Sequence, residues 1–126
     1  MSLETKVINK TVLIAEDEYM MLKTLDLFFT NMGFNTVLAR DGEDALTKFA
    51  NNEVDLVCTD LIMPYKSGLD VLKEAKLKSS DLPVFIFTAL EDDLYQELAK
   101  ANGVDVYTYK PVSENIIKEY VDKVLF

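Results

Sequence analysis

Two patterns of apolar and polar positions alternate along this chain. Short, nearly continuous apolar runs of four to six residues are separated by longer segments in which apolar residues recur every three or four positions. The short runs are typical of strands that are buried on both faces of a parallel sheet, and the longer segments are typical of amphipathic helices. The predicted strands are Thr11–Ala15, Asn35–Leu38, Asp55–Thr59, Pro83–Thr88 and Val104–Tyr109, and a helix is predicted after each.

Residues that favour helix ends agree with this division. Short polar side chains that cap helix N-termini stand before three of the predicted helices, and glycines stand just after two of them. The capping residues are Asp41, Ser67 and Ser113, and the glycines are Gly33 and Gly103. The acidic residues 91–93 are interpreted in the same way, as the N-terminal end of the fourth helix.

Strands that alternate with helices over this length predict one α/β domain with three layers, a parallel sheet and right-handed crossovers. Five strands fit the doubly wound, flavodoxin-like (βα)5 arrangement with the order 2-1-3-4-5. The domain is expected to cover residues 11–126, and residues 1–10 are expected to form an N-terminal extension.

Composition excludes several classes of function. A net charge of −9 argues against direct binding to nucleic acid or to an anionic membrane, and no apolar run is long enough to cross a bilayer. The absence of histidine excludes catalytic triads, zinc sites and phosphoacceptors that depend on this residue. The single cysteine, Cys58, permits no internal disulfide, and this favours a reducing, cytoplasmic location. Cys58 itself is expected to be an inert core residue.

Chemically active side chains stand at the ends of four predicted strands. These residues are Glu16, Asp17, Asp60, Thr88 and Lys110. The carboxyl ends of parallel strands meet at one edge of a sheet, so three carboxylates are expected to crowd together there unless one is protonated or a cation neutralises them. Hard oxygen ligands favour Mg²⁺, and a carboxylate beside Mg²⁺, a lysine and a hydroxyl is suited to phosphoryl transfer.

The segments that carry these residues resemble one family. Residues Val12–Glu18, Ala39–Leu46, Val54–Pro64, Thr88–Ala89 and Tyr109–Pro111 are similar, in this order, to the motifs of receiver domains of bacterial two-component response regulators, including the chemotaxis regulators. The resemblance extends from about Thr11 to the C-terminus. It implies a phosphorylation-dependent signalling switch that modifies itself without turnover, and therefore not an enzyme in the usual sense.

The resemblance also implies a role for each site residue. Asp60 is expected to accept a phosphoryl group from the phosphohistidine of a sensor histidine kinase or a histidine phosphotransfer protein. Asp17, Asp60 and the backbone carbonyl of Ile62 are expected to bind Mg²⁺, with Glu16 assisting through water. Lys110, whose bond to Pro111 is expected to be cis, would pair with the phosphoryl oxygens.

The switch itself is expected to involve two further side chains. Thr88 would move to the phosphoryl group, and Tyr107 would then turn inward. Tyr109 is expected to face away from Tyr107. The neighbours of the site are apolar at Ile62 and Leu90, and we expect this pair to hinder attack by water and to prolong the acyl phosphate.

Other functions fit the sequence less well. In phosphatases of the haloacid dehalogenase type, the nucleophilic aspartate follows the first strand and a second aspartate comes two residues later. Here Asp17 follows the first strand, but the residue two positions later is Tyr19. A flavodoxin-type flavin site needs a glycine- and hydroxyl-rich loop that Glu16–Glu18 does not provide. A pseudo-receiver, which keeps the fold without phosphorylation, stays an alternative. The sequence does not identify the output partner or an attached output domain. It also leaves open whether the chain is a single-domain regulator or part of a longer one. A homodimer through the face of the fourth helix, fifth strand and fifth helix is also open.

Overall fold

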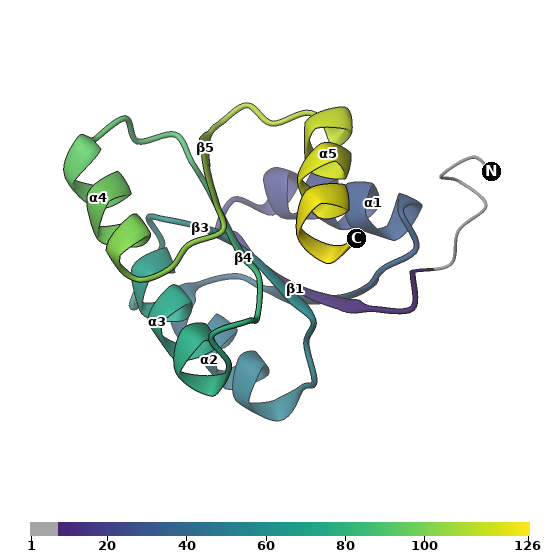
Figure 1. Ribbon diagram of the computed structural model, residues 1–126, viewed down its shortest axis with the longest axis horizontal. Coiled ribbons are helices and arrows are strands. Elements are labelled where there is room, and N and C mark those ends of the chain that lie inside the picture. Colours follow the sequence, from purple (N-terminus) through teal and green to yellow (C-terminus); the bar gives the residue numbers. More distant parts are fainter. Residues whose placement is uncertain (1–7) are drawn as a thin grey trace.

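The computed structural model describes residues 8–126 and consists of alternating strands and helices (Figure 1). The strands are β1 (Thr11–Ala15), β2 (Asn35–Ala39), β3 (Leu56–Asp60), β4 (Val84–Thr88) and β5 (Val106–Tyr109). The helices are α1 (Tyr19–Asn31), α2 (Gly42–Asn51), α3 (Gly68–Lys78), α4 (Asp93–Ala101) and α5 (Glu114–Leu125). All five predicted strands are confirmed, with ends that differ by up to two residues.

The strands form one parallel sheet in the order β2-β1-β3-β4-β5, which confirms the predicted flavodoxin-like topology. Helices α1 and α5 cover one face of the sheet, and α2, α3 and α4 cover the other (Figure 1). No helix within residues 8–126 combines the length and the apolar character needed to cross a bilayer. Of the expected N-terminal extension, residues 1–10, the part up to residue 7 lies outside the described residues.

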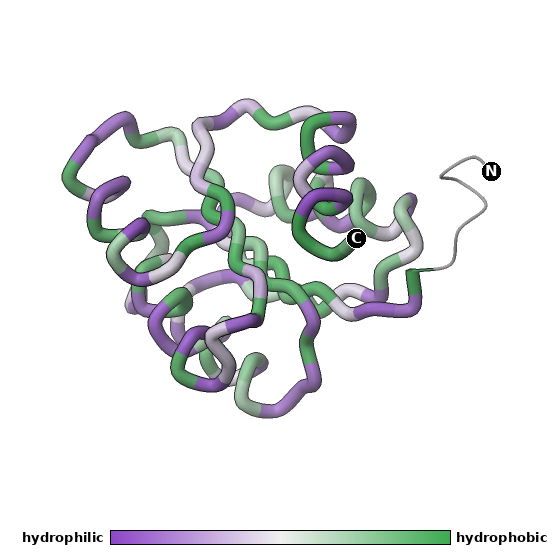
Figure 2. Tube along the Cα trace, in the orientation of Figure 1, coloured by the Kyte–Doolittle hydropathy of each residue, from purple (hydrophilic) through white to green (hydrophobic). Residues whose placement is uncertain are grey.

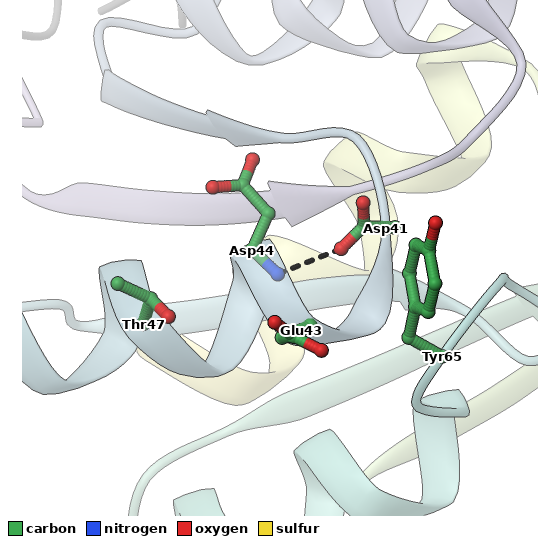
Figure 3. Close-up of a pocket in the computed structure, with 5 residues that line it drawn as sticks. All are labelled: Asp41, Glu43, Asp44, Thr47 and Tyr65. Atoms are coloured by element: carbon green, nitrogen blue, oxygen red, sulfur yellow. Dashed lines mark hydrogen bonds between the residues drawn. The ribbon is translucent and has the colours of Figure 1, made fainter.

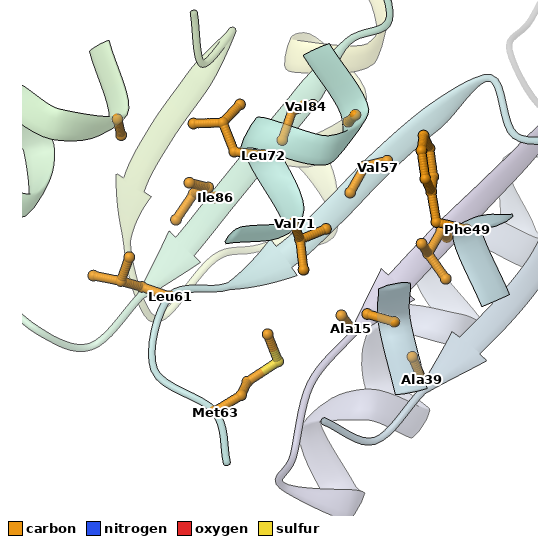
Figure 4. Packing of buried hydrophobic residues seen from close by; sticks show 14 residues of the cluster. Ala15, Ala39, Phe49, Val57, Leu61, Met63, Val71, Leu72, Val84 and Ile86 are labelled. Atoms are coloured by element: carbon orange, nitrogen blue, oxygen red, sulfur yellow. The ribbon is translucent and has the colours of Figure 1, made fainter. Parts of the chain in front are cut away.

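Alternation along the central strands supplies both cores. In β1, Leu13 faces the cluster under α2, α3 and α4, whereas Val12 and Ile14 face the cluster under α1 and α5. Neighbouring strands repeat this alternation, so the centre of the sheet is apolar on both faces, as Figure 2 shows by the green central strands. Figure 4 shows the first cluster, in which Val57 and Ile86 of the sheet pack beneath Leu72 of α3.

The predicted helix ends are also confirmed. Asp41 and Ser113 accept hydrogen bonds from the backbone of the first turns of α2 and α5, and Ser67 forms a capping box with Asp70 at the start of α3. Gly33 and Gly103 follow α1 and α4 with φ angles of 98° and 85°, a conformation that glycine adopts without a steric penalty. These ends set where each strand delivers its last residue to the edge of the sheet.

Candidate phosphoryl-acceptor site

The carboxyl ends of β1, β3, β4 and β5 bring the predicted polar residues together. In the sheet, Ala15 lies beside Thr59, and Thr88 lies beside Tyr109. Glu16 therefore leaves β1 next to the end of β3, and Lys110 leaves β5 next to the end of β4. The backbone N–H of Lys110 donates to the carbonyl of Thr88 at 2.8 Å, which fixes where the lysine side chain begins.

Lys110 connects two of the carboxylates. Its ammonium group donates to Glu16 Oε1 at 2.5 Å and to Asp60 Oδ2 at 3.2 Å. Glu16 is almost completely buried, at 2% exposure, and its second oxygen accepts from the backbone N–H of Glu18 at 3.1 Å. The other oxygen of Asp60 accepts from the N–H of Leu61 at 2.7 Å. Each oxygen of Glu16 and Asp60 therefore has a donor within the protein.

Burial and neighbouring charges shift the pKa values of two residues at this edge, Lys110 and Asp17. Burial of the ammonium group acts to lower the pKa of Lys110, but its hydrogen bond to Glu16 and the charge of Asp60 outweigh this effect and raise that pKa above its usual 10.5. Partial burial of the carboxyl group and the neighbouring Glu16 raise the pKa of Asp17. Asp17 therefore holds its charge less readily than an isolated aspartate does.

The three carboxylates are close enough to share one cation. Glu16, Asp17 and Asp60 each offer an oxygen, and these oxygens lie within 4.8 Å of one another. When ionised, the three carboxylates exceed the single charge of Lys110 by two. This arrangement is compatible with a divalent cation, and carboxylate oxygens on an open edge suit Mg²⁺, which retains several waters when bound to proteins.

The approach to Asp60 is largely apolar. A cavity of about 300 Å³ is lined by Asp60, Ile62, Thr88, Ala89 and Leu90. The side chains of Ile62 and Leu90 are 51% and 37% exposed, so both stand at its mouth. Thr88 is buried, and its hydroxyl accepts from the N–H of Leu90 at 3.0 Å.

Tyr107 lies on the face of the sheet that Thr88 also occupies. In the parallel register Tyr107 pairs with Ile86, which is two residues from Thr88 and therefore points to the same side. The expectation that Tyr109 faces away from Tyr107 is wrong. Residues two apart in a strand share a face, and the two rings pack edge to face with their centroids 6.1 Å apart.

Three other features adjoin this site. Cys58 is buried on β3, and burial, followed by the charge of Glu16, raises the pKa of its thiol. The Lys110–Pro111 peptide bond is cis. Gly42 and Gly68, which contact the loop after Asp60, were not identified from the sequence, because nothing in their local pattern indicates which backbone lies against them.

Known proteins are similar to this chain in sequence and in structure. Residues 12–122 match the family described as the response regulator receiver domain. This chain belongs to that family. It is 37% identical over 102 residues to Response regulator RR06 of Streptococcus pneumoniae, covering 81% of this chain and 46% of that protein, and 35% identical over 122 residues to Regulator of RpoS of Escherichia coli, covering 94% and 36%. The chain thus spans half or less of the length of these relatives.

Solved structures agree with the family assignment. A response regulator receiver domain protein from Clostridium thermocellum is 27% identical and superimposes with a TM-score of 0.85, covering 92% of this chain and 94% of that one. The CheX–CheY–BeF3–Mg²⁺ complex from Borrelia burgdorferi contains a chain that is 26% identical with a TM-score of 0.86, covering 100% and 96%. Receiver domains of this family act as signalling domains in two-component systems and not as ordinary enzymes.

Proposed function

We propose that this receiver domain is a phosphorylation-dependent switch in which Asp60 is the phosphoacceptor. An oxygen of the Asp60 carboxylate would attack the phosphorus of a phosphohistidine on a histidine kinase or a phosphotransfer protein. The P–N bond would break, and its electron pair would return to the imidazole ring, which takes up a proton. The observation that carries this proposal is the contact of Lys110 with Asp60 at 3.2 Å, beside the cluster of three carboxylates.

Each neighbouring group has a part in this proposal. Asp17, Asp60 and the Ile62 carbonyl would bind Mg²⁺, with Glu16 assisting, and the bound ion would offset negative charge on the incoming phosphoryl group. Lys110 would exchange part of its present contact with Asp60 for a phosphoryl oxygen. The related complex from Borrelia burgdorferi, described with BeF3 and Mg²⁺, supports a site of this kind in the family.

The signal would pass from Thr88 to Tyr107. The hydroxyl of Thr88 accepts one bond from Leu90 and can turn its proton toward an oxygen of the phosphoryl group. The hydroxyl of Tyr107 is buried and has no hydrogen-bond partner among residues 8–126, so the present position of the ring is not fixed by a polar contact. We therefore propose that Tyr107 is the side chain that changes position when Thr88 moves.

The face that would report this change carries exposed leucines. Leu94 and Leu98 lie one helical turn apart on α4 and are 62% and 41% exposed. An effector, an attached output domain or a second copy of the chain would bind the face of α4, β5 and α5. Binding of a second copy is distinguished from the other two by an increase in the mass of the phosphorylated protein in solution.

The experiment that tests this function is intact mass spectrometry after incubation with Mg²⁺ and acetyl phosphate. The unchanged protein is expected to gain one phosphoryl group, and the gain should require Mg²⁺ and be absent from Asp60→Asn. A control substitution, Asp81→Asn, removes an exposed aspartate that is far from β3's carboxyl end and should leave the gain unchanged. No gain, from this donor or from a phosphorylated histidine kinase, would instead favour the pseudo-receiver.

The lifetime of the acyl phosphate tests the roles of Ile62 and Leu90. Both side chains stand at the mouth of the cavity, where they would shield the phosphoryl group from water. Replacing Ile62 with asparagine and Leu90 with glutamate should accelerate dephosphorylation, measured by the decay of the phosphorylated mass after the donor is removed. Equal decay rates in the unchanged protein and both variants would show that these side chains do not control access of water.

A further inference from the structure

The loop between Asp60 and α3 is held at both of its ends. At the end next to α3, the N–H of Gly68 donates to the carbonyl of Leu61, at the other end of the loop, at 2.8 Å. A Cβ atom at Gly68 would clash with the carbonyl oxygen of Asp60. The loop also carries Met63, whose side chain is buried in the cluster beneath α2 and α3. Ile62 lies between Leu61 and Met63, so both of its neighbours are held in place and its backbone follows the path of the loop.

The middle of the loop contains an unusual turn. Tyr65 has a φ angle of 72°, and the N–H of Lys66 donates to the carbonyl of Pro64 at 2.9 Å, two residues earlier. This pattern is that of a γ-turn with a positive central φ, which is rare and strained for a residue that is not glycine. Such a conformation persists only where the surroundings hold it.

The start of α2 supplies that support. The N–H of Gly42 donates to the same Pro64 carbonyl at 3.3 Å, and the carbonyl of Lys66 lies directly against the Gly42 backbone. A Cβ atom at Gly42 would lie closer to this carbonyl than the 3.0 Å below which real Cβ atoms are essentially never found. Figure 3 shows the Tyr65 ring beside Asp41, the residue that caps α2.

Glycine at position 42 is required by this contact and not by its own backbone. Its φ angle lies outside the left-handed region, unlike those of Gly33 and Gly103. At the first position of a helix an alanine would ordinarily be accepted without cost, because glycine is the poorer helix former. The close approach of Lys66 is therefore what a larger residue would disturb.

We propose that Gly42 is a positioning residue for the magnesium site. By admitting the Lys66 carbonyl against the start of α2, it holds the turn at Tyr65 and with it the backbone carbonyl of Ile62, three residues earlier. This inference rests on the proposed function, in which the Ile62 carbonyl is a ligand of Mg²⁺. Residues that orient metal ligands from outside typically affect metal affinity by about 10- to 100-fold.

The test compares Mg²⁺ affinity in Gly42→Ala with that in Gly33→Ala. Both variants replace a glycine at a helix boundary, and Gly33→Ala introduces strain at a φ of 98° far from the loop. Isothermal titration with Mg²⁺ is performed at a temperature at which circular dichroism shows every variant to be folded. Gly42→Ala is expected to weaken Mg²⁺ binding by about tenfold or more, and Gly33→Ala to leave it within about twofold. Equal affinities for Gly42→Ala and the unchanged protein would overturn the inference.

A second background keeps the test decisive if Gly42→Ala does not fold. Tyr65→Gly removes the strain of the turn and lets the loop move away from an added Cβ atom, so the double variant with Gly42→Ala is expected to fold. Adding Gly42→Ala to Tyr65→Gly should weaken Mg²⁺ binding by about tenfold relative to Tyr65→Gly alone. Equal affinities in this pair would also overturn the inference. Absence of Mg²⁺ binding by the unchanged protein would overturn the proposed metal site, and this inference with it.

Discussion

Replacing Asp17 with asparagine should stabilise the protein without Mg²⁺, although it removes a proposed metal ligand. The oxygens of Glu16, Asp17 and Asp60 lie within 4.8 Å of one another. At that separation, two like charges repel by about 0.9 kcal/mol in water and about 3.5 kcal/mol at an effective dielectric constant of about 20. Because Asp17 is exposed and Lys110 offsets part of the repulsion, the lower value applies, and we expect a net gain of about 1 kcal/mol.

The pH dependence of this gain follows from the pKa of Asp17. Partial burial and the neighbouring Glu16 raise that pKa above the usual 3.8, so the folded protein binds the proton more tightly than the unfolded chain does. The repulsion is therefore fully present above the raised pKa, and it is relieved as the pH falls through the raised value toward 3.8. The advantage of asparagine should be greatest near neutral pH and should shrink in acid.

Thermal unfolding followed by circular dichroism measures the effect. In EDTA at neutral pH, Asp17→Asn should raise Tm by about 3–5 °C for a domain of this size. In excess Mg²⁺ the unchanged protein gains stability from the bound ion, whereas the variant gains little, so the order of the two Tm values should reverse. The control Glu119→Gln removes the same charge from an exposed position on α5. A Tm for Asp17→Asn no higher than that of this control would refute the repulsion argument.

Three further predictions concern the groups around Asp60. Lys110→Met leaves Glu16 buried without its cationic partner and should lower the free energy of unfolding at pH 7 by about 3 kcal/mol in urea titrations. Because the pKa of Lys110 is raised, its contribution is present below pH 10.5 and is lost as the pH rises through the raised value, so the variant should lack this alkaline loss. Tyr107→Phe should change the free energy of unfolding by less than about 1 kcal/mol, since the hydroxyl has no partner within residues 8–126, and a larger loss would reveal a missed hydrogen bond. The thiol of Cys58 should resist iodoacetamide at pH 8 until denaturant is added, because burial raises its pKa, and rapid labelling of the native protein would contradict its place in the core.

The strands were predictable because burial on both faces leaves a continuous apolar signal in the sequence. The run from Val12 to Ala15 is fully buried, and β3 and β4 also contain runs of at least four successive buried residues. The less apolar strand β5 was placed with less accuracy: it begins at Val106, two residues later than predicted. The strand ends then placed Asp17, Asp60 and Lys110 together, because parallel strands all deliver their carboxyl ends to one edge.

Contacts through space were not predictable in the same way. The clash that Gly42 avoids involves Lys66, a residue 24 positions later, and the sequence around either one does not name the other. The positive φ angle of Tyr65 was also missed, because tyrosine is not a residue that indicates a left-handed conformation. Both features depend on how α2 packs beside the loop after β3, which is decided by the core beneath them.

The role of Glu16 shows how geometry refines a chemical expectation. The resemblance to receiver domains implied only that Glu16 assists a metal ion through water. In the fold, one oxygen of Glu16 accepts from Lys110 and the other from the N–H of Glu18, so the buried side chain holds the lysine at 2.5 Å. Asp60 accepts from the same ammonium group at the longer distance of 3.2 Å, and in the proposed function Lys110 would therefore exchange Asp60, and not Glu16, for a phosphoryl oxygen.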